Sequence, residues 1–219
     1  EYYPNATIDV VEIDPEVVAV ARKHFAVPQD PRLRVSAMDG RSFLRDAGTY
    51  DIVVLDAYSK TYVPFHLMTL EFFEALDEHL SPDGVIVSNL ISSLIGDTSE
   101  LLEAEVATIK GVLPQVYLFP TRNRQLALVQ NINLVATKAP ARLDVQDLLT
   151  VAEAHPVRGV PFEQYIGNLV ASNIAAGGDL VLTDDYAPAE DLLNPITATP
   201  FEEGTGLVPR SSLNPLFLA

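Results

Sequence analysis

The chain has 219 residues, of which 48% are hydrophobic and 20% are charged, a composition typical of a globular domain with one sizeable core. Its 30 acidic and 14 basic residues give a net charge of −16, which argues against a nucleic-acid-binding surface and would favour a cationic substrate. The absence of cysteine excludes disulfides and thiolate chemistry, and it fits a cytoplasmic protein. No stretch reaches the roughly 20 apolar residues that a membrane segment requires.

A strand that ends in acidic residues and leads into a helix is predicted over Thr7–Phe25. The strand itself is predicted for Thr7–Ile13. Pro15 suits the first helical turn, because its missing N–H would have no partner there, and Asp14 fits the N-cap. Glu12 would lie at the carboxyl end of the strand, where a carboxylate can accept hydrogen bonds from both hydroxyls of a ribose. A solvated strand end with a capped helix is the alternative.

Two further predicted strands are each followed by an acidic residue. Leu33–Met38 precedes Asp39-Gly40, a dipeptide that also fits an ordinary turn, and Tyr50–Leu55 precedes Asp56. In a doubly wound sheet the carboxyl ends of successive strands converge on one crevice. We therefore expect Glu12 and these two aspartates to surround a single ligand.

Strands and helices alternate along much of the chain, which predicts an open, mostly parallel α/β sheet with helices on both faces. The β-branched run Ile52–Val54 predicts a strand that is buried on both faces. Two strands without a helix between them, Val116–Phe119 and Ala127–Lys138, predict an antiparallel edge. The remaining predicted elements are a strand at Gly84–Leu90, a short helix at Arg41–Asp46, and helices at Leu67–Leu80, Ser99–Val112, Leu143–Ala154 and Phe162–Ala175.

A resemblance to a known family is carried by EIDPEVVAVARKHF, MDGRSFL and YDIVVLDAYS, and by the later PFHLMTLEFFEAL, SPDGVIVSNL and LTDDYAP. These segments, from about Thr7 to Leu193, resemble the spermidine synthase-like (polyamine aminopropyltransferase) branch of the class I S-adenosylmethionine-dependent methyltransferase fold. The resemblance implies a transferase of polyamine biosynthesis with a Rossmann-like sheet. The family's first strand and glycine-rich loop have no counterpart before Thr7, so the sheet is expected to be N-terminally incomplete.

The resemblance also assigns roles to individual residues. Glu12, with Asp14 beside it, would bind the ribose of decarboxylated S-adenosylmethionine or of S-adenosylmethionine itself. Asp39 would accept from the adenine amino group, with Gly40 against the ring. Asp56 would border the nucleoside and act as the catalytic carboxylate that deprotonates or orients an attacking amine such as putrescine. The other assigned residues are Ala57 at the nucleoside and Tyr58, Asp184, Asp185 and Tyr186 at the amine.

Two alternatives to aminopropyl transfer remain open. Polyamine synthases usually carry a second acid three residues after the catalytic one; here that position is Ser59, followed by Lys60, which would repel a diamine. A methyltransferase of the same fold and a non-catalytic binding module are therefore kept as alternatives, and the resemblance also admits a homodimer.

One nucleoside-binding transferase domain is predicted for residues 1–193, in which 138–193 form a helical C-terminal addition. The stretch 194–219 is rich in Pro, Gly, Thr and Ser and is predicted to be a loosely ordered tail or linker. The four histidines lack metal-ligand spacing, so no metal site is predicted.

Overall fold

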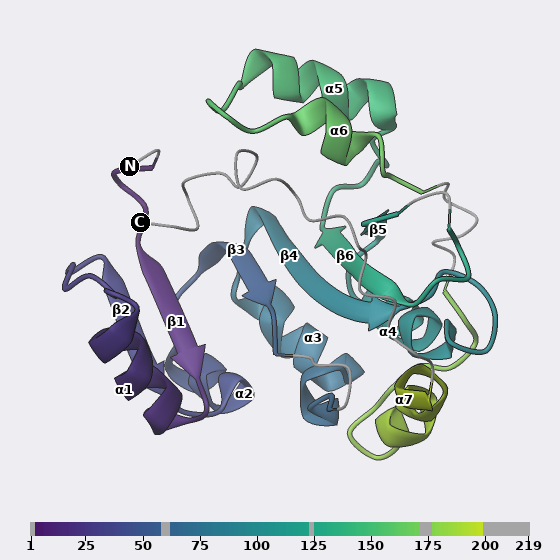
Figure 1. Cartoon of the computed structure of the whole chain (residues 1–219), viewed down its shortest axis with the longest axis horizontal. Helices are drawn as coiled ribbons and strands as arrows, with labels where there is room; N and C mark the ends of the chain where they lie inside the picture. Colours follow the sequence, from purple (N-terminus) through teal and green to yellow (C-terminus); the bar gives the residue numbers. More distant parts are fainter. Residues whose placement is uncertain (1–2, 58–61, 123–124, 171–176, 199–219) are drawn as a thin grey trace.

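The computed structural model describes residues 3–57, 62–122, 125–170 and 177–198 (Figure 1). Its N-terminal unit is a two-stranded parallel sheet, β1 (Ile8–Glu12) and β2 (Leu33–Ala37), joined by helix α1 (Pro15–His24). The side chain of Asp14 accepts a hydrogen bond from the backbone N–H of Glu16 at 2.7 Å. Helix α1 therefore begins where the sequence predicts, with a side-chain cap followed by proline.

A four-stranded sheet forms the centre of the molecule. Its strands lie in the order β3 (Tyr50–Leu55), β4 (Leu80–Ser92), β6 (Gln130–Thr137) and β5 (Gln115–Pro120). β3 and β4 are parallel, whereas β6 is antiparallel to both of its neighbours. The reversed strand therefore lies inside the sheet and not at its edge, because β6 enters between β4 and β5.

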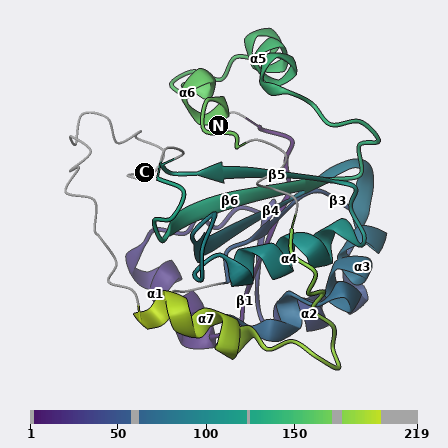
Figure 2. The ribbon, with the colours of Figure 1, turned by 90° about the vertical axis from the view of Figure 1, so that its right-hand side faces the viewer.

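One face of the four-stranded sheet carries the main hydrophobic core. Successive side chains of a strand point to opposite faces, and along β4 and β6 fully or nearly fully buried residues alternate with half-buried or exposed ones. Helices α3 (Leu70–Glu78) and α4 (Glu100–Lys110) cover the buried face (Figure 2). The largest contributors to this core include Ile86, Leu90, Ile132 and Leu134 from the strands and Phe72, Phe73, Leu101 and Ile109 from the helices.

Helices α5 (Val145–Ala154) and α6 (Phe162–Ile166) lie on the opposite side of the sheet from α3 and α4 (Figure 2). The sequence predicts a longer second helix, to residue 175, but α6 ends at Ile166, and residues 171–176 are outside the described ranges. Within those ranges, no helix has the length and apolar character needed to cross a membrane.

The elements that complete the fold are short, apart from the last helix. Helix α7 (Ala189–Ala198) crosses the domain boundary predicted at residue 193, and Ile196 is fully buried beyond it. Residues 194–198 of the stretch predicted as a tail therefore belong to this helix, and the rest of that stretch lies outside the described ranges. The other elements are helix α2 (Gly40–Phe43) and the 3₁₀ turns η1 (Leu44–Asp46) and η2 (Phe65–Leu67).

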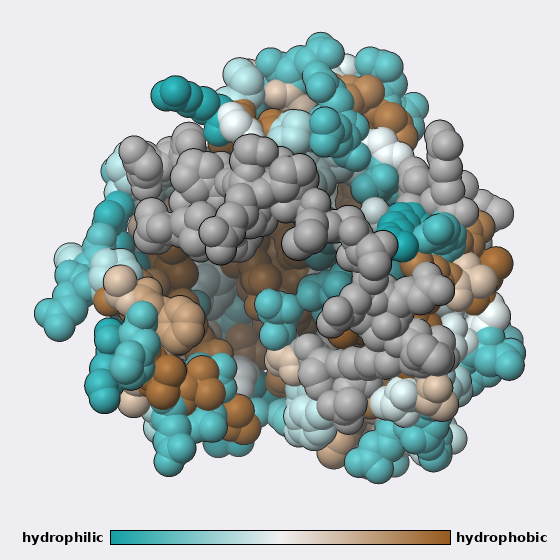
Figure 3. Space-filling view, viewed as in Figure 1, coloured by the Kyte–Doolittle hydropathy of each residue, from teal (hydrophilic) through white to brown (hydrophobic). Residues whose placement is uncertain are grey.

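The facing edges of β1 and β3 pair with no other strand in the described ranges. Among the described residues, β1 pairs with β2 and β3 pairs with β4, while both strands run in the same direction (Figure 1). Ile52 and Val54 of β3 have 62% and 64% of their surface exposed. The prediction of a strand buried on both faces was wrong here, because no element in the described ranges covers this face of β3. Hydrophobic surface is visible over this part of the molecule (Figure 3).

Candidate functional site

The ends of β1 and β2 bring two of the predicted acidic residues close together. Glu12 is paired in register with Ala37, and the backbone N–H of Met38 donates to the carbonyl of Glu12 at 2.9 Å. Asp39 follows immediately. Because the two strands are parallel and end at the same level, Glu12 and Asp39 lie together at the carboxyl end of the two-stranded sheet.

Glu12 retains capacity for a ligand, whereas Asp14 is used by its own helix. Oε1 of Glu12 accepts the backbone N–H of Asp14 at 2.9 Å, and no hydrogen bond from a described residue reaches Oε2. Oδ1 of Asp14 caps α1 through the N–H of Glu16. The geometry thus gives Asp14 a structural function in addition to the ligand contact that the resemblance implies.

Both carboxylate oxygens of Asp39 have partners. Oδ1 accepts the backbone N–H of Ser42 at 2.8 Å and so caps α2, while Oδ2 lies 2.7 Å from Nε2 of His66. Burial alone would raise the pKa of Asp39, but the hydrogen bonds from Ser42 and His66 outweigh it, and the pKa lies below its usual value. A ligand amino group that approaches Asp39 would share Oδ2 with His66, a residue that the sequence prediction did not assign.

Asp56 follows β3 and is exposed, as is Ala57. Nδ2 of Asn89, on the neighbouring strand β4, donates to Oδ1 of Asp56 at 3.2 Å. No hydrogen bond from a described residue reaches Oδ2 of Asp56, so that oxygen is open to a ligand. The predicted Tyr58 lies outside the described residues.

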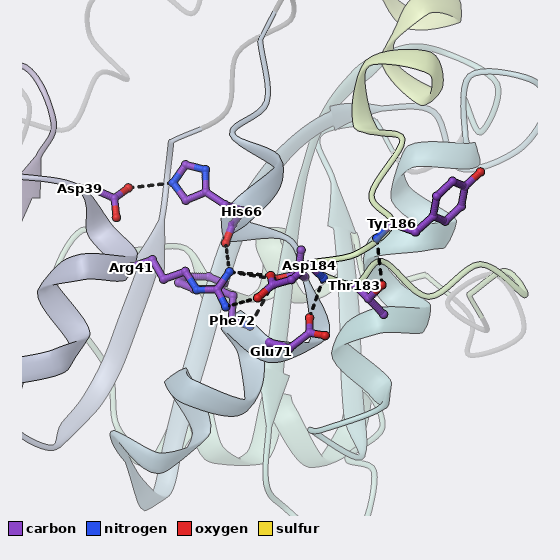
Figure 4. Close-up of polar contacts among 9 residues, drawn as sticks. Asp39, Arg41, His66, Glu71, Phe72, Thr183, Asp184 and Tyr186 are labelled. Carbon is purple, nitrogen blue, oxygen red and sulfur yellow. Dashed lines mark hydrogen bonds and ion pairs between the residues drawn. The ribbon is translucent and has the colours of Figure 1, made fainter.

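An ion-pair network joins α2 to the C-terminal segment 182–186 (Figure 4). Arg41 donates from Nη1 and Nη2 to the two oxygens of Asp184, each at 2.6 Å, and the hydroxyl of Thr69 donates to Oδ1 at 2.7 Å. The Arg41 guanidinium lowers the pKa of Asp184, and the carboxylate raises the pKa of Arg41. Asp185 and Tyr186 are exposed.

The predicted site residues therefore fall into three groups. Glu12 and Asp39 lie at the carboxyl end of the two-stranded sheet, and Asp56 lies at the end of β3. Asp184–Tyr186 are held against α2 and α3. All three strands point in the same direction, so the first two groups lie at the same end of the molecule (Figure 1). Among the described residues, no cluster of His, Asp or Glu is arranged to hold a metal ion.

Residues that the sequence reading missed are His66, Arg41 and Asn89. Arg41 belongs to the quoted MDGRSFL segment, but 143 residues separate it from Asp184, and 27 separate His66 from Asp39. Pairs so distant in sequence leave no signal in local spacing.

Known proteins are similar to this chain in sequence. The model of the spermine/spermidine synthase domain matches residues 2–142. A polyamine aminopropyltransferase of Vibrio vulnificus is 38% identical over 197 residues, which cover 86% of this chain and 62% of that protein. The chain thus spans less than two thirds of the length of this relative.

Solved structures of known proteins share the fold. A probable spermidine synthase from Corynebacterium glutamicum superposes with a TM-score of 0.65 at 21% identity, covering 85% of this chain and 66% of that one. Human methyltransferase-like protein 13, solved in complex with SAH, gives a TM-score of 0.56 at 25% identity, covering 69% and 70%.

Proposed function

Because the chain belongs to the spermine/spermidine synthase domain family, we propose that it transfers an aminopropyl group from decarboxylated S-adenosylmethionine to an amine such as putrescine. The observation that carries the proposal is the position of Glu12, Asp39 and Asp56, which follow or end three strands that run in one direction. Three carboxylates at the carboxyl ends of strands that run in one direction suit a nucleoside with a cationic sulfonium centre.

Glu12 and Asp39 are the nucleoside ligands in this proposal. Oε2 of Glu12 is available to a ribose hydroxyl, while the N–H of Asp14 holds the other oxygen in place. Asp39 is oriented by the N–H of Ser42 and by His66, and its Oδ2 would accept from the adenine amino group. Gly40 follows Asp39 in the sequence and would lie against the adenine ring, while Ala57, which follows Asp56, would border the nucleoside.

Asp56 is the general base in this proposal. An alkylammonium ion has no lone pair, so a carboxylate must remove a proton before the nitrogen can attack. The nitrogen lone pair forms a bond to the methylene carbon beside sulfur, the carbon–sulfur bond breaks, and methylthioadenosine leaves as a neutral sulfide. The proton passes to the open Oδ2 of Asp56, while Asn89 holds Oδ1.

The proposal is tested by replacing Asp56 with asparagine. The variant keeps the size and the capacity to accept from Asn89 but cannot accept the proton, so kcat should fall by roughly 10²-fold or more. Affinity for methylthioadenosine, measured by calorimetry, should stay within about twofold of the wild type. An equal loss of nucleoside affinity would contradict the assignment of Asp56 as the general base.

Methyl transfer is the second candidate, favoured by the likeness to the human methyltransferase that was solved with SAH. Parallel assays with the two sulfonium donors separate the candidates, because aminopropyl transfer releases methylthioadenosine and methyl transfer releases S-adenosylhomocysteine. If the protein binds neither product in calorimetry, both enzymatic functions are excluded and a non-catalytic binding module remains.

A further inference from the structure

The C-terminal segment 182–186 is held against α3 and α4 by backbone contacts. The carbonyl of the buried Leu182 accepts from the N–H of Leu70 at 2.8 Å, and the N–H of Leu182 donates to the hydroxyl of Thr108 at 2.8 Å. The N–H of Asp184 donates to Oε2 of Glu71 at 2.9 Å. The segment is therefore docked at the start of α3 before its side chains are considered.

The carboxylate of Asp184 adds a charged contact to this docking. Arg41 binds both of its oxygens in a bidentate geometry, which is the strongest common form of an ion pair in proteins. The fully buried Thr69 donates a third hydrogen bond, and Nη1 of Arg41 also reaches the carbonyl of His66 at 3.3 Å. Figure 4 shows Arg41 between the Asp39–His66 pair and the segment that carries Tyr186.

Asp185 differs from its neighbour Asp184 in its hydrogen-bond and ion-pair partners, although both residues are exposed. Thr183 and Tyr186 close a turn through two reciprocal backbone hydrogen bonds of 3.0 and 3.1 Å, and Asp184 and Asp185 occupy its two central positions. Asp185 is exposed and has no hydrogen-bond or ion-pair partner among the described residues. No cation in the described ranges pairs with its carboxylate, whereas Arg41 pairs with that of Asp184.

We infer that Arg41 and Asp184 form a latch that positions residues 182–186, and that Asp185 is the carboxylate of this segment that meets the cationic amine. The second half of the inference rests on the proposed function. A carboxylate already bound by a guanidinium offers little attraction to an ammonium group, and displacing Arg41 would leave a cation without its partner. Asp184 is thus a positioning residue, and the amine is bound by its neighbour.

Hydrogen exchange measured by mass spectrometry tests the latch without any activity. Asp184→Asn and Arg41→Gln should each raise the exchange of the Leu182–Tyr186 amides roughly tenfold, because the charged contact that holds the segment is lost. Arg41→Lys should give an intermediate increase, since lysine makes one contact where arginine makes two. Asp185→Asn is the matched control and should leave exchange unchanged, as should Arg32→Gln, which removes contacts with Asp30 and the carbonyl of Pro4 but none with the segment 182–186.

Calorimetry with putrescine, in the presence of methylthioadenosine, tests whether Asp185 binds the amine. Asp185→Asn should weaken putrescine binding roughly tenfold by removing a charge-assisted contact while segment exchange stays at the wild-type rate. If Asp184→Asn weakens putrescine binding without changing exchange, Asp184 is the ligand and the inference is overturned. If the wild type binds no putrescine, the proposed function and the role of Asp185 both fail, while the exchange data still decide whether the latch exists.

Discussion

Asn89 is the uncharged side chain that contacts the proposed general base. It lies on β4 beside β3 and donates to Asp56 at 3.2 Å, so it fixes the direction in which the remaining oxygen points. Asn89→Ala should lower kcat roughly tenfold through loss of this orientation and leave nucleoside affinity unchanged. Asn133→Ala is the control, because Asn133 pairs with Asn89 in register and has an exposed side chain. Equal losses in the two variants would contradict the prediction.

Asp9 gives a prediction about pH. Arg34 lowers its pKa below the usual 3.8 by more than burial raises it, and the Tyr50 hydroxyl adds to the lowering. A carboxyl whose pKa is lowered by folding contributes stability above its unfolded pKa and loses it as the pH falls through the folded pKa. In urea unfolding, the advantage of the wild type over Asp9→Asn should be complete at neutral pH and shrink below about pH 4. An advantage that persists undiminished at about pH 3 would contradict this assignment.

At the scale of elements, the approach of segment 177–182 to α4 depends on one glycine. Gly177 has φ +84°, and a Cβ there would lie 2.9 Å from the backbone nitrogen of Ala107. Gly177→Ala should therefore destabilise the fold by about 1–3 kcal/mol in urea unfolding. Gly48→Ala is the matched control, since a Cβ there meets no atom within 4 Å. A loss at Gly48 as large as that at Gly177 would show that steric contact is not the cause.

The elements were predictable from the sequence to the extent that local chemistry determines them. Asp14 and Pro15 place the start of α1, and the β-branched Ile52–Val54 run lies within β3 as expected. Burial of that run depends on what lies beside the strand, which no local pattern records. The first residues of the predicted tail are helical, because Pro195, a residue type that indicates irregular structure, lies inside α7. The Arg41–Asp184 pair joins segments 143 residues apart and had no local signal at all.

At the scale of the whole molecule, β1 and β2 form a sheet separate from the other four strands. The Tyr50 hydroxyl of β3 reaches across to Asp9 of β1 at 2.8 Å. We expect amides of β1 and β2 to exchange faster than those of β4 and β6, whose ladders are flanked by further strands and a packed helical layer.

The Tyr50→Phe variant tests whether the Tyr50–Asp9 hydrogen bond slows the exchange of β1 and β2. Loss of the hydroxyl should speed exchange in β1 and β2 several-fold, in line with one hydrogen bond of about 1 kcal/mol, and leave β4 and β6 unchanged. The control is Tyr165→Phe, because Tyr165 is exposed on α6. Uniform exchange across all six strands in the wild type would show that the two sheets open as a single unit.

The division into two sheets has a mechanical consequence for the proposed chemistry. Glu12 and Asp39 are carried by one sheet and Asp56 by the other, so within the part of the chain that the structure describes no continuous hydrogen-bonded ladder sets the distance between the nucleoside ligands and the base. A bound nucleoside would contact both sheets and hold them in a fixed relative position. Its binding energy would then be partly used to stiffen the molecule. The substrate would in this way help to assemble the geometry in which it reacts.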